Sequence, residues 1–296
     1  MKLVVLTFAG RECSMKILFK LIIKYKKYIN EYRLYVATTI QSDIDYMESF
    51  ATSNDFVKII YCKGDKELIW DTAYKSCQEE DSVYLKLDDD IVYFDETLFT
   101  DFINYRVNNK NAPIIYPVII NNHFISWKLQ EKNIINPELK TNIGNTWVNT
   151  YKRIRNHIIA NKHLRLRIGD FTRGDEVLCP IAWGNLKYCY DLHNNFIEDI
   201  KNNNLQKYYL RENVTLENCE VVSINACSWL GSNLKEYTEK YGTIYYDECW
   251  LSLYLPTWSG DKNIIYGNCV VSHYSYYRQR ELGLDSTDIL ERYANI

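Results

Sequence analysis

The stretch Val83-Tyr84-Leu85-Lys86-Leu87-Asp88-Asp89-Asp90-Ile91-Val92 joins a short, mostly apolar segment to three consecutive carboxylates. Adjacent acids repel one another, and a protein rarely concentrates them without a cation nearby. In extended backbone, side chains two positions apart point the same way, so we predict that Asp88 and Asp90 face one site and Asp89 another. Two carboxylates leave room for water and phosphate oxygens around an octahedral Mg²⁺ or Mn²⁺. The alternative is a solvated acidic turn in which Asp90 caps the next segment.

The residues before this stretch alternate between strand-like and helix-like patterns. The predicted strands are residues 2–8, 34–39, 56–62 and 82–87, and the predicted helices are residues 10–28, 42–51 and 66–78. Such alternation is typical of an α/β fold with a mostly parallel, Rossmann-like central sheet flanked by helices. In these sheets ligands bind beyond the carboxyl ends of the strands, so the residues that follow each strand are candidate site residues.

The second half of the chain is less regular. We predict strands at residues 114–120, 220–227 and 264–271, and helices at 191–202, 246–255 and 286–293. Pro256 is expected to stop the second of these helices. Residues 121–170 are polar and aromatic, and we predict an irregular, aromatic-rich insertion there. No internal repeat and no linker rich in Pro, Gly or Ser divides the sequence, so residues 1–296 are predicted to form a single domain.

The composition is that of an ordinary globular protein, with 47% hydrophobic and 25% charged residues. A net charge of −3 argues against nucleic acid as the main partner. The 26 tyrosines are explained largely by core packing and by a bias towards Asn, Lys, Ile and Tyr, although aromatic faces also pack well on sugar rings. One basic cluster is interpreted as a solvated helix face or a patch for an acidic ligand: Lys152, Arg153, Arg155, Lys162, Arg165 and Arg167.

The cysteines and the apolar start bear on the compartment. Nine cysteines are scattered along the chain without a CxxC pair, which gives no support to a zinc ribbon or a thioredoxin-like motif. Free thiols in a reducing compartment are therefore expected. The apolar start is too short for a membrane span and lacks the layout of a signal peptide. We expect a soluble, cytoplasmic protein without a membrane span.

An apolar strand that ends in Asp-x-Asp, late in an alternating α/β half, resembles the GT-A glycosyltransferases. In that family the motif holds a divalent ion that bridges the diphosphate of a nucleotide-sugar. The resemblance implies a GT-A-like fold with Mn²⁺ (or Mg²⁺) as cofactor. It places Asp88 near the ribose or the ion, Asp90 on the ion and Asp89 in the variable middle. It also implies that residues 1–112 bind the nucleotide-sugar and that residues 113–296 bind the acceptor.

Two later patches match the family in the expected order. Asp247 and Glu248, within Tyr246-Asp247-Glu248-Cys249-Trp250, look like its acidic pair at the start of a helix. There the second acid commonly deprotonates the acceptor hydroxyl, a role that falls on Glu248 with Asp247 as the substitute. The order Asp-Glu departs from the commoner Glu-Asp, and a plain helix cap is the alternative. His273 is similar to a late histidine that serves some members as another metal ligand, and imidazole suits Mn²⁺. A structural histidine is the alternative.

The resemblance also implies contacts with the nucleotide-sugar near the start of the chain and around the aspartates. Arg11 is expected to meet phosphate, Asp43 the base, and Trp229 the donor sugar or simply the core. The residues expected to contact the nucleotide-sugar are Thr7, Phe8, Arg11, Asp43, Lys86, Asp88, Asp89 and Trp229. The acceptor is expected to meet the aromatic middle segment, with Trp127, Trp147 and Trp183 as loose candidates.

The sequence therefore predicts transfer of a sugar from a nucleoside diphosphate, most simply UDP, to a hydroxyl of a glycan or glycoconjugate. A nucleotidyltransferase shares the sheet but usually carries a Gly-rich basic loop after the first strand, whereas Ala9-Gly10-Arg11-Glu12 holds one glycine. A carbohydrate-binding relative without activity is a further alternative, and a metal-dependent nuclease is a more distant one. Inversion and retention at the anomeric carbon both remain open.

Overall fold

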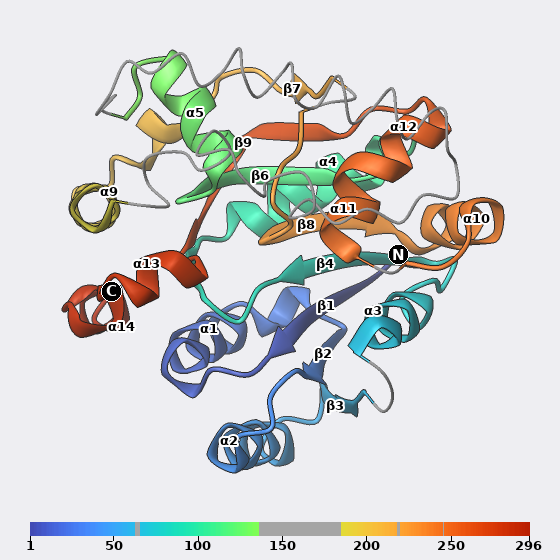
Figure 1. Cartoon of the computed structure of the whole chain (residues 1–296), viewed down its shortest axis with the longest axis horizontal. Coiled ribbons are helices and arrows are strands. Elements are labelled where there is room, and N and C mark those ends of the chain that lie inside the picture. The colour runs from blue at the N-terminus through green and yellow to red at the C-terminus, as the bar shows by residue number, and fades with distance from the viewer. Residues whose placement is uncertain (63–65, 136–184, 218–219, 245) are drawn as a thin grey trace.

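The computed structural model describes residues 1–62, 66–135, 185–217, 220–244 and 246–296, and the statements below concern these residues. Within them, nine strands form one sheet in the order β3-β2-β1-β4-β8-β6-β9-β5, with β7 paired to β9. Helices lie on both faces of the sheet (Figure 1). The predicted α/β fold, with a mostly parallel central sheet and flanking helices, is confirmed.

The first four strands are parallel and form one half of the sheet. They are β1 (Lys2–Ala9), β2 (Glu31–Val36), β3 (Val57–Tyr61) and β4 (Ser82–Leu87). They alternate with α1 (Glu12–Lys24), α2 (Gln41–Thr52) and α3 (Lys66–Lys75). The chain order reverses at β1, because β2 lies on one side of it and β4 on the other. Ligands in open α/β sheets bind at such a switch point, beyond the carboxyl ends of the strands.

The second half of the sheet mixes directions. Its strands are β5 (Ile91–Phe94), β6 (Ile115–Ile120), β7 (Val214–Thr215), β8 (Ala226–Leu230) and β9 (Ile264–His273). The helices of this half are α4 (Ile103–Asn108), α5 (His123–Glu131), α9 (Leu186–Lys201), α10 (Gly231–Tyr241), α11 (Asp247–Cys249), α12 (Leu255–Ser259), α13 (Tyr277–Glu281) and α14 (Ile289–Ala294). In Figure 1, α14 packs beside α1, so the last helix lies against the first.

Strand directions decide where the polar residues gather. β8 is antiparallel to both β4 and β6, so β4 and β6 run the same way, and β9 is parallel to β6. The carboxyl ends of β1, β4, β6 and β9 therefore lie at one edge of the sheet, together with the amino end of β8. Asp88, Asn121 and His273 end or follow three of these strands, and Asn225 precedes β8.

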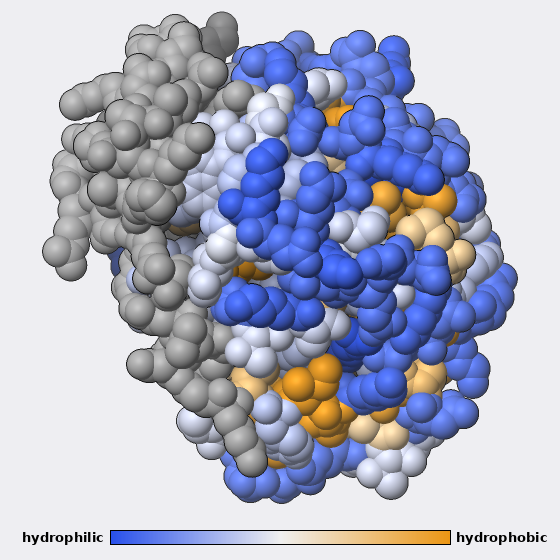
Figure 2. Space-filling view, turned by 90° about the vertical axis from the view of Figure 1, so that its right-hand side faces the viewer, coloured by the Kyte–Doolittle hydropathy of each residue, from blue (hydrophilic) through white to orange (hydrophobic). Residues whose placement is uncertain are grey.

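The core explains why some strands were easy to recognise. β4 and β6 are buried along their whole length and β1 along all but its first residue, so these strands read as nearly continuous apolar runs. Thr7, Ser82 and Lys86 are their buried polar exceptions. The face in Figure 2 is largely hydrophilic, and its hydrophobic side chains gather only in separate patches. Most large apolar side chains of the described residues are buried, and their removal from water is the main force that stabilises the fold.

Several predicted elements are shifted along the chain, and for two of them the contacts give the reason. The strand predicted at 220–227 begins only at Ala226, because the carbonyls of Ile224 and Asn225 accept hydrogen bonds from Lys86 Nζ and Asp88 N instead (both 2.8 Å). The helix predicted at 246–255 does not stop at Pro256. A π-helical segment, Trp250–Tyr254, follows α11, and Pro256 then lies in the first turn of α12, where its missing N–H is tolerated. The helix ends at Gly260, whose φ is 81°.

Several other expectations have simpler outcomes. Most of the predicted insertion at 121–170 lies outside the described residues, as does the basic cluster between Lys152 and Arg167. The described first part of the insertion forms the turn after β6 and then α5. The cysteines in the described ranges are free thiols. Among the helices of the described ranges, none combines the length and the apolar character needed to cross a bilayer.

Candidate metal centre and catalytic site

The three aspartates form a tight turn between β4 and β5. The Ile91 N–H donates to the Asp88 carbonyl across it (3.1 Å). Backbone bonds anchor both ends, since Asp88 N donates to the Asn225 carbonyl and Tyr274 N donates to the Asp90 carbonyl (2.8 Å each). The prediction that Asp88 and Asp90 share one side rested on extended backbone, and that reason is wrong. The turn nevertheless directs these two carboxylates to one place.

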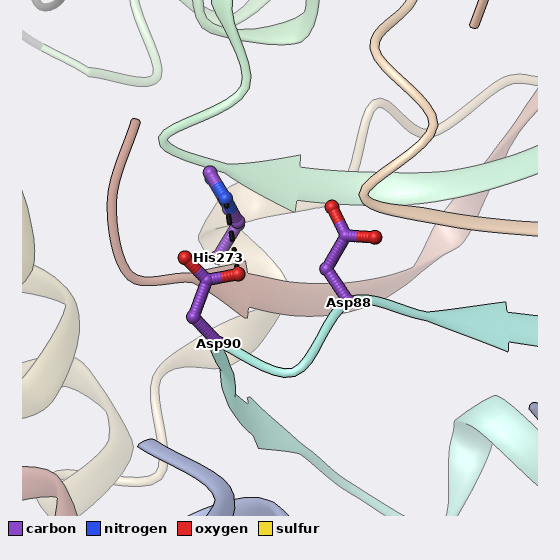
Figure 3. Close-up of side chains that lie close together, drawn as sticks. All are labelled: Asp88, Asp90 and His273. Atoms are coloured by element: carbon purple, nitrogen blue, oxygen red, sulfur yellow. Dashed lines mark ion pairs between the residues drawn. The ribbon is translucent and has the colours of Figure 1, made fainter. Parts of the chain in front are cut away.

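Asp88, Asp90 and His273 form a cluster that could hold a metal ion. Their ligand atoms all lie within 4.8 Å of one another. Figure 3 shows the Asp90 carboxylate and the His273 imidazole facing each other, with the Asp88 carboxylate beside them. Oδ1 of Asp90 lies 3.3 Å from Nε2 of His273. The donor set of two carboxylates and one imidazole suits Mn²⁺ well and Mg²⁺ less well.

The Asp90 carboxylate supplies a test of whether a cation fits. Its Oδ1 atom is buried and has no hydrogen-bond partner of good geometry among the described residues. Buried polar atoms rarely stay unsatisfied, so this oxygen needs a partner. Burial raises the pKa of Asp90, but His273 and Arg11 outweigh that effect and hold its pKa well below the usual value. Asp90 is therefore an ionised carboxylate with an open coordination position, as a metal ligand must be.

Asp89 turns away from the cluster and anchors the loop after β1. Its carboxylate accepts hydrogen bonds from the Gly10 N–H (2.9 Å) and from Arg11 Nε (3.0 Å). Arg11 also reaches Asp90, with Nη1 at 2.9 Å from Oδ2. Burial raises the pKa of Asp89 to about 6, against the opposing effect of Arg11. Asp89 thus points towards the loop after β1, and Arg11 lies beside both Asp89 and Asp90.

Lys86 is buried just before the turn. Its ammonium group donates to Oδ1 of Asp88 and to the Ile224 carbonyl (2.8 Å to the carbonyl). Burial lowers the pKa of Lys86, but the charges of Asp88 and Asp247 outweigh this and raise it. Lys86 therefore stays charged and neutralises part of the acidic cluster, in addition to holding Asp88.

The acidic pair begins α11, as predicted for a helix start. Asp247 accepts from the Tyr74 hydroxyl (3.0 Å) and from the Glu248 N–H (2.9 Å), so its carboxylate oxygens are engaged. Glu248 is half-buried and accepts from Ser223 Oγ (2.5 Å). Burial raises the pKa of Glu248 to about 7, and the negative charges of Asp247 and Asp88 add to the effect. A carboxylate with this pKa can both release and accept a proton near neutral pH.

One short segment links the acidic pair to the metal cluster. Ser223 binds Glu248, and two residues later Asn225 Nδ2 donates to Oδ2 of Asp88 (3.1 Å). The Asn225 side-chain oxygen accepts from Asn122 (3.0 Å) and from the Tyr276 hydroxyl (3.2 Å). A continuous chain of hydrogen bonds therefore runs from Asp88 to the strand end at β6 and to α13.

The sequence reasoning missed these connecting residues. Asn121, Asn122 and His123 directly follow the apolar β6, which is the same signal that singled out the aspartates after β4. The hydroxyl oxygen of Ser223 lies 3.2 Å from Nδ1 of His123, but the segment that contains Ser223 was predicted as a strand. Polar residues inside a predicted strand read as surface positions, so Ser223 and Asn225 gave no usable signal.

Thr7 and Phe8, which were predicted to contact the nucleotide-sugar, lie in the core instead, and so does Trp229, for which the core was the alternative. Thr7 is fully buried and accepts a hydrogen bond from the Tyr32 hydroxyl (3.0 Å). Phe8 packs edge-on against Trp70, with ring centroids 4.5 Å apart. Trp229 is 1% exposed, stacks on Tyr84 and donates to the Cys77 carbonyl (3.2 Å). The side chains of consecutive strand residues must pack on the two covered faces of the sheet, so they are not offered to a ligand at its edge.

The remaining candidates divide in the same way. Asp43 accepts a hydrogen bond from the Glu12 N–H at the start of α1 (3.0 Å). The carboxylate that was predicted to contact the base of the nucleotide is therefore already engaged within the fold. Trp127 is half-buried on α5 against Phe124, whereas Trp147 and Trp183 lie outside the described residues. His193, which was not a candidate, is buried and contacts the Tyr293 hydroxyl (2.9 Å) and the Tyr274 carbonyl (2.8 Å), which is a structural role.

Comparison with known proteins gives weak similarities. No protein-family model matches the chain, and no curated protein sequence does. A 4-diphosphocytidyl-2C-methyl-D-erythritol synthase from Anaerococcus prevotii is 16% identical over 40% of this chain and 56% of its own, with a TM-score of 0.31. The S. aureus protein TarS, residues 1–349, is 11% identical over 67% of this chain and 80% of its own, with a TM-score of 0.34. This chain thus spans little more than half of the synthase, and similarities this low do not identify a function.

Proposed function

We propose that this protein is a glycosyltransferase that uses a divalent metal ion, Mn²⁺ or Mg²⁺, to move a sugar from a nucleoside diphosphate to a hydroxyl. One observation carries the proposal. The Asp88, Asp90 and His273 cluster lies at the carboxyl edge of the sheet, and a second, proton-accepting carboxylate, Glu248, is tied to it through Ser223 and Asn225. Metal ligands beside a general base suit the activation of a leaving group and a nucleophile together.

The donor is proposed to bind at the switch point between β1 and β4, in the half formed by residues 1–112. Gly10 and Arg11 belong to the loop there, and Arg11 is proposed to bind the diphosphate next to Asp90. Asp88, Asp90 and His273 would hold the metal, which would supply positive charge to neutralise the leaving diphosphate. Lys86 fixes the Asp88 carboxylate and supplies a further positive charge. UDP is the proposed nucleotide.

Glu248 is proposed as the base that removes the acceptor proton. Asp247 is the poorer choice because Tyr74 and the backbone of α11 already occupy its oxygens. Ser223 fixes Oε1 of Glu248, and the pKa of about 7 keeps a proton acceptor available near neutral pH. With Glu248 as the base, direct displacement inverts the anomeric carbon. The acceptor, a glycan or glycoconjugate, is proposed to bind through residues 113–296.

Release of the nucleoside diphosphate tests the proposal. Wild-type protein is incubated with a panel of UDP-, GDP- and ADP-sugars and Mn²⁺, and the free diphosphate is measured with and without EDTA. We expect release from one donor class, its loss with EDTA, and its loss in Asp90→Ala. Diphosphate release that persists in Asp90→Ala contradicts the metal assignment. A protein that binds sugars but releases no diphosphate belongs to the inactive carbohydrate-binding class, and release of pyrophosphate from a nucleoside triphosphate points to nucleotidyl transfer.

A further inference from the structure

Two buried amides, Asn121 and Gln279, lie on the side of His273 opposite Asp90. Nε2 of His273 faces Asp90, whereas Nδ1 lies 3.3 Å from the backbone carbonyl of Asn121. Asn121 is 1% exposed and Gln279 is fully buried. The proposed mechanism uses neither residue, yet each makes several hydrogen bonds in a place where polar groups are costly to bury.

The two amides are locked to each other in one orientation. Asn121 Nδ2 donates to the Gln279 side-chain oxygen (3.0 Å), and Gln279 Nε2 donates back to the Asn121 side-chain oxygen (2.8 Å). Backbone groups fix which end is which. Asn121 Nδ2 also donates to the Tyr274 carbonyl (2.8 Å), and the Gln279 oxygen also accepts from the Tyr276 N–H (2.7 Å). A carbonyl can only accept and an N–H can only donate, so neither amide can be flipped.

This lock holds an unusual backbone conformation. Asn121 has a φ of 61°, in the left-handed region of backbone conformation. Residues other than glycine rarely adopt this region, and asparagine is among those that tolerate it best. That conformation turns the Asn121 carbonyl towards His273 Nδ1. The carbonyl accepts only, so Nδ1 must carry a hydrogen, and in the neutral imidazole that a metal binds the lone pair is then on Nε2. Nε2 is the nitrogen that faces Asp90.

We infer that Asn121 and Gln279 are positioning residues that fix the tautomer and the ring orientation of His273 for metal binding. The inference rests on the proposed metal site and adds the residues that prepare it. Ligating histidines are commonly oriented by an acceptor on their second nitrogen, and loss of such partners typically weakens metal binding 10- to 100-fold. Here the acceptor is a backbone carbonyl, which no substitution removes, so the amide pair that aims it is the part open to mutation.

Mn²⁺ binding to the purified protein, measured by electron paramagnetic resonance of the free ion, tests the inference without any substrate. Gln279→Met removes the amide at similar length, and we expect the dissociation constant for Mn²⁺ to rise about tenfold or more. Asn121→Gly is the milder second variant, because glycine keeps the left-handed φ but loses the amide. We expect it to weaken Mn²⁺ binding in the same direction and to fold even where Gln279→Met does not.

Asn263→Leu is the matched control. Asn263 is a buried amide with hydrogen bonds to the Ile114 N–H and the Leu251 carbonyl (3.1 Å each). It directly precedes the first residue of β9, whereas His273 is the last, so the rise per residue of a strand places the two roughly 30 Å apart. It should lose stability and keep wild-type Mn²⁺ affinity. Unchanged affinity in both amide variants overturns the inference and leaves the metal site standing. A wild-type protein that binds Mn²⁺ no better than Asp90→Ala overturns the metal site, and the inference with it.

Discussion

At the scale of single residues, Glu248 links the proposed chemistry to pH. A base must be ionised to accept a proton, and burial raises the pKa of Glu248 to about 7. We predict that the transfer rate rises with pH through a single ionisation near that value. Glu248→Gln should lower kcat by about 10²- to 10⁴-fold, the usual contribution of a general base, with little change in the donor KM. Steady-state kinetics from pH 5 to 9 measure both, and a donor KM that rises as much as kcat falls would refute the role of base.

The same carboxylate makes a prediction about stability. The pKa of Glu248 is about 7 in the folded protein against an ordinary 4.5, so its ionised form is less favourable folded than unfolded. The cost is absent below pH 4.5, grows as the pH rises towards 7, and is complete above it. We predict that Glu248→Gln raises the free energy of unfolding at pH 8 by up to about 3 kcal/mol, from 1.36 kcal/mol per pKa unit, and by little at pH 4.5.

Urea unfolding at the two pH values measures this difference. Glu239→Gln, on an exposed position of α10, is the matched control and should change neither value. A Glu248→Gln variant that is no more stable than wild type at pH 8 would show that the pKa of Glu248 is not raised. A gain in stability together with a loss of activity would indicate that Glu248 serves activity while it lowers the stability of the folded protein.

At the scale of elements, the sequence patterns predicted those strands whose burial on both faces requires mostly apolar residues. β4 and β6 were found because their residues are mostly apolar, and β9 because apolar runs lie at both ends of its predicted range. The segment before β8 was not, because its backbone is tied to Lys86 and Asp88, residues far away in sequence. The direction of β8, which brings Ser223 and Asn225 to the site, is likewise set by pairing with β4. No local pattern contains that information.

The contact of α10 with the loop before β4 gives an element-scale prediction. A Cβ at Gly231, the first residue of α10, would lie 2.0 Å from the Glu79 carbonyl oxygen, which is backbone and has little room to move. Alanine normally favours a helix over glycine by about 1 kcal/mol. We predict the opposite sign here, with Gly231→Ala destabilising by about 1–3 kcal/mol through overpacking. Urea unfolding checks it, with the exposed neighbour Ser232→Ala as control; a stabilised Gly231→Ala would contradict the close approach.

At the scale of the whole molecule, the fold concentrates negative charge at one edge of the sheet. Five carboxylates gather there against two cations, Arg11 and Lys86: Asp88, Asp89, Asp90, Asp247 and Glu248. The whole chain has 35 basic and 38 acidic residues, so the charged residues outside this edge balance. A nucleoside diphosphate that approaches this edge therefore meets like charge unless a cation binds as well.

This imbalance predicts that metal and nucleotide bind together. We expect UDP without metal to leave the melting temperature unchanged, Mn²⁺ alone to raise it slightly, and the two together to raise it by more than the sum. A ligand present at 100 times its dissociation constant stabilises the folded state by about 2.7 kcal/mol. Thermal-shift measurements over a grid of the two ligands give the coupling directly. Asp90→Ala should abolish the joint effect, whereas Asp191→Ala, at a half-buried position on α9 that pairs with Lys187, should retain it. If UDP alone stabilised wild type and Asp90→Ala equally, the metal would have no part in holding the diphosphate, and Arg11 and Lys86 would have to bind it unaided.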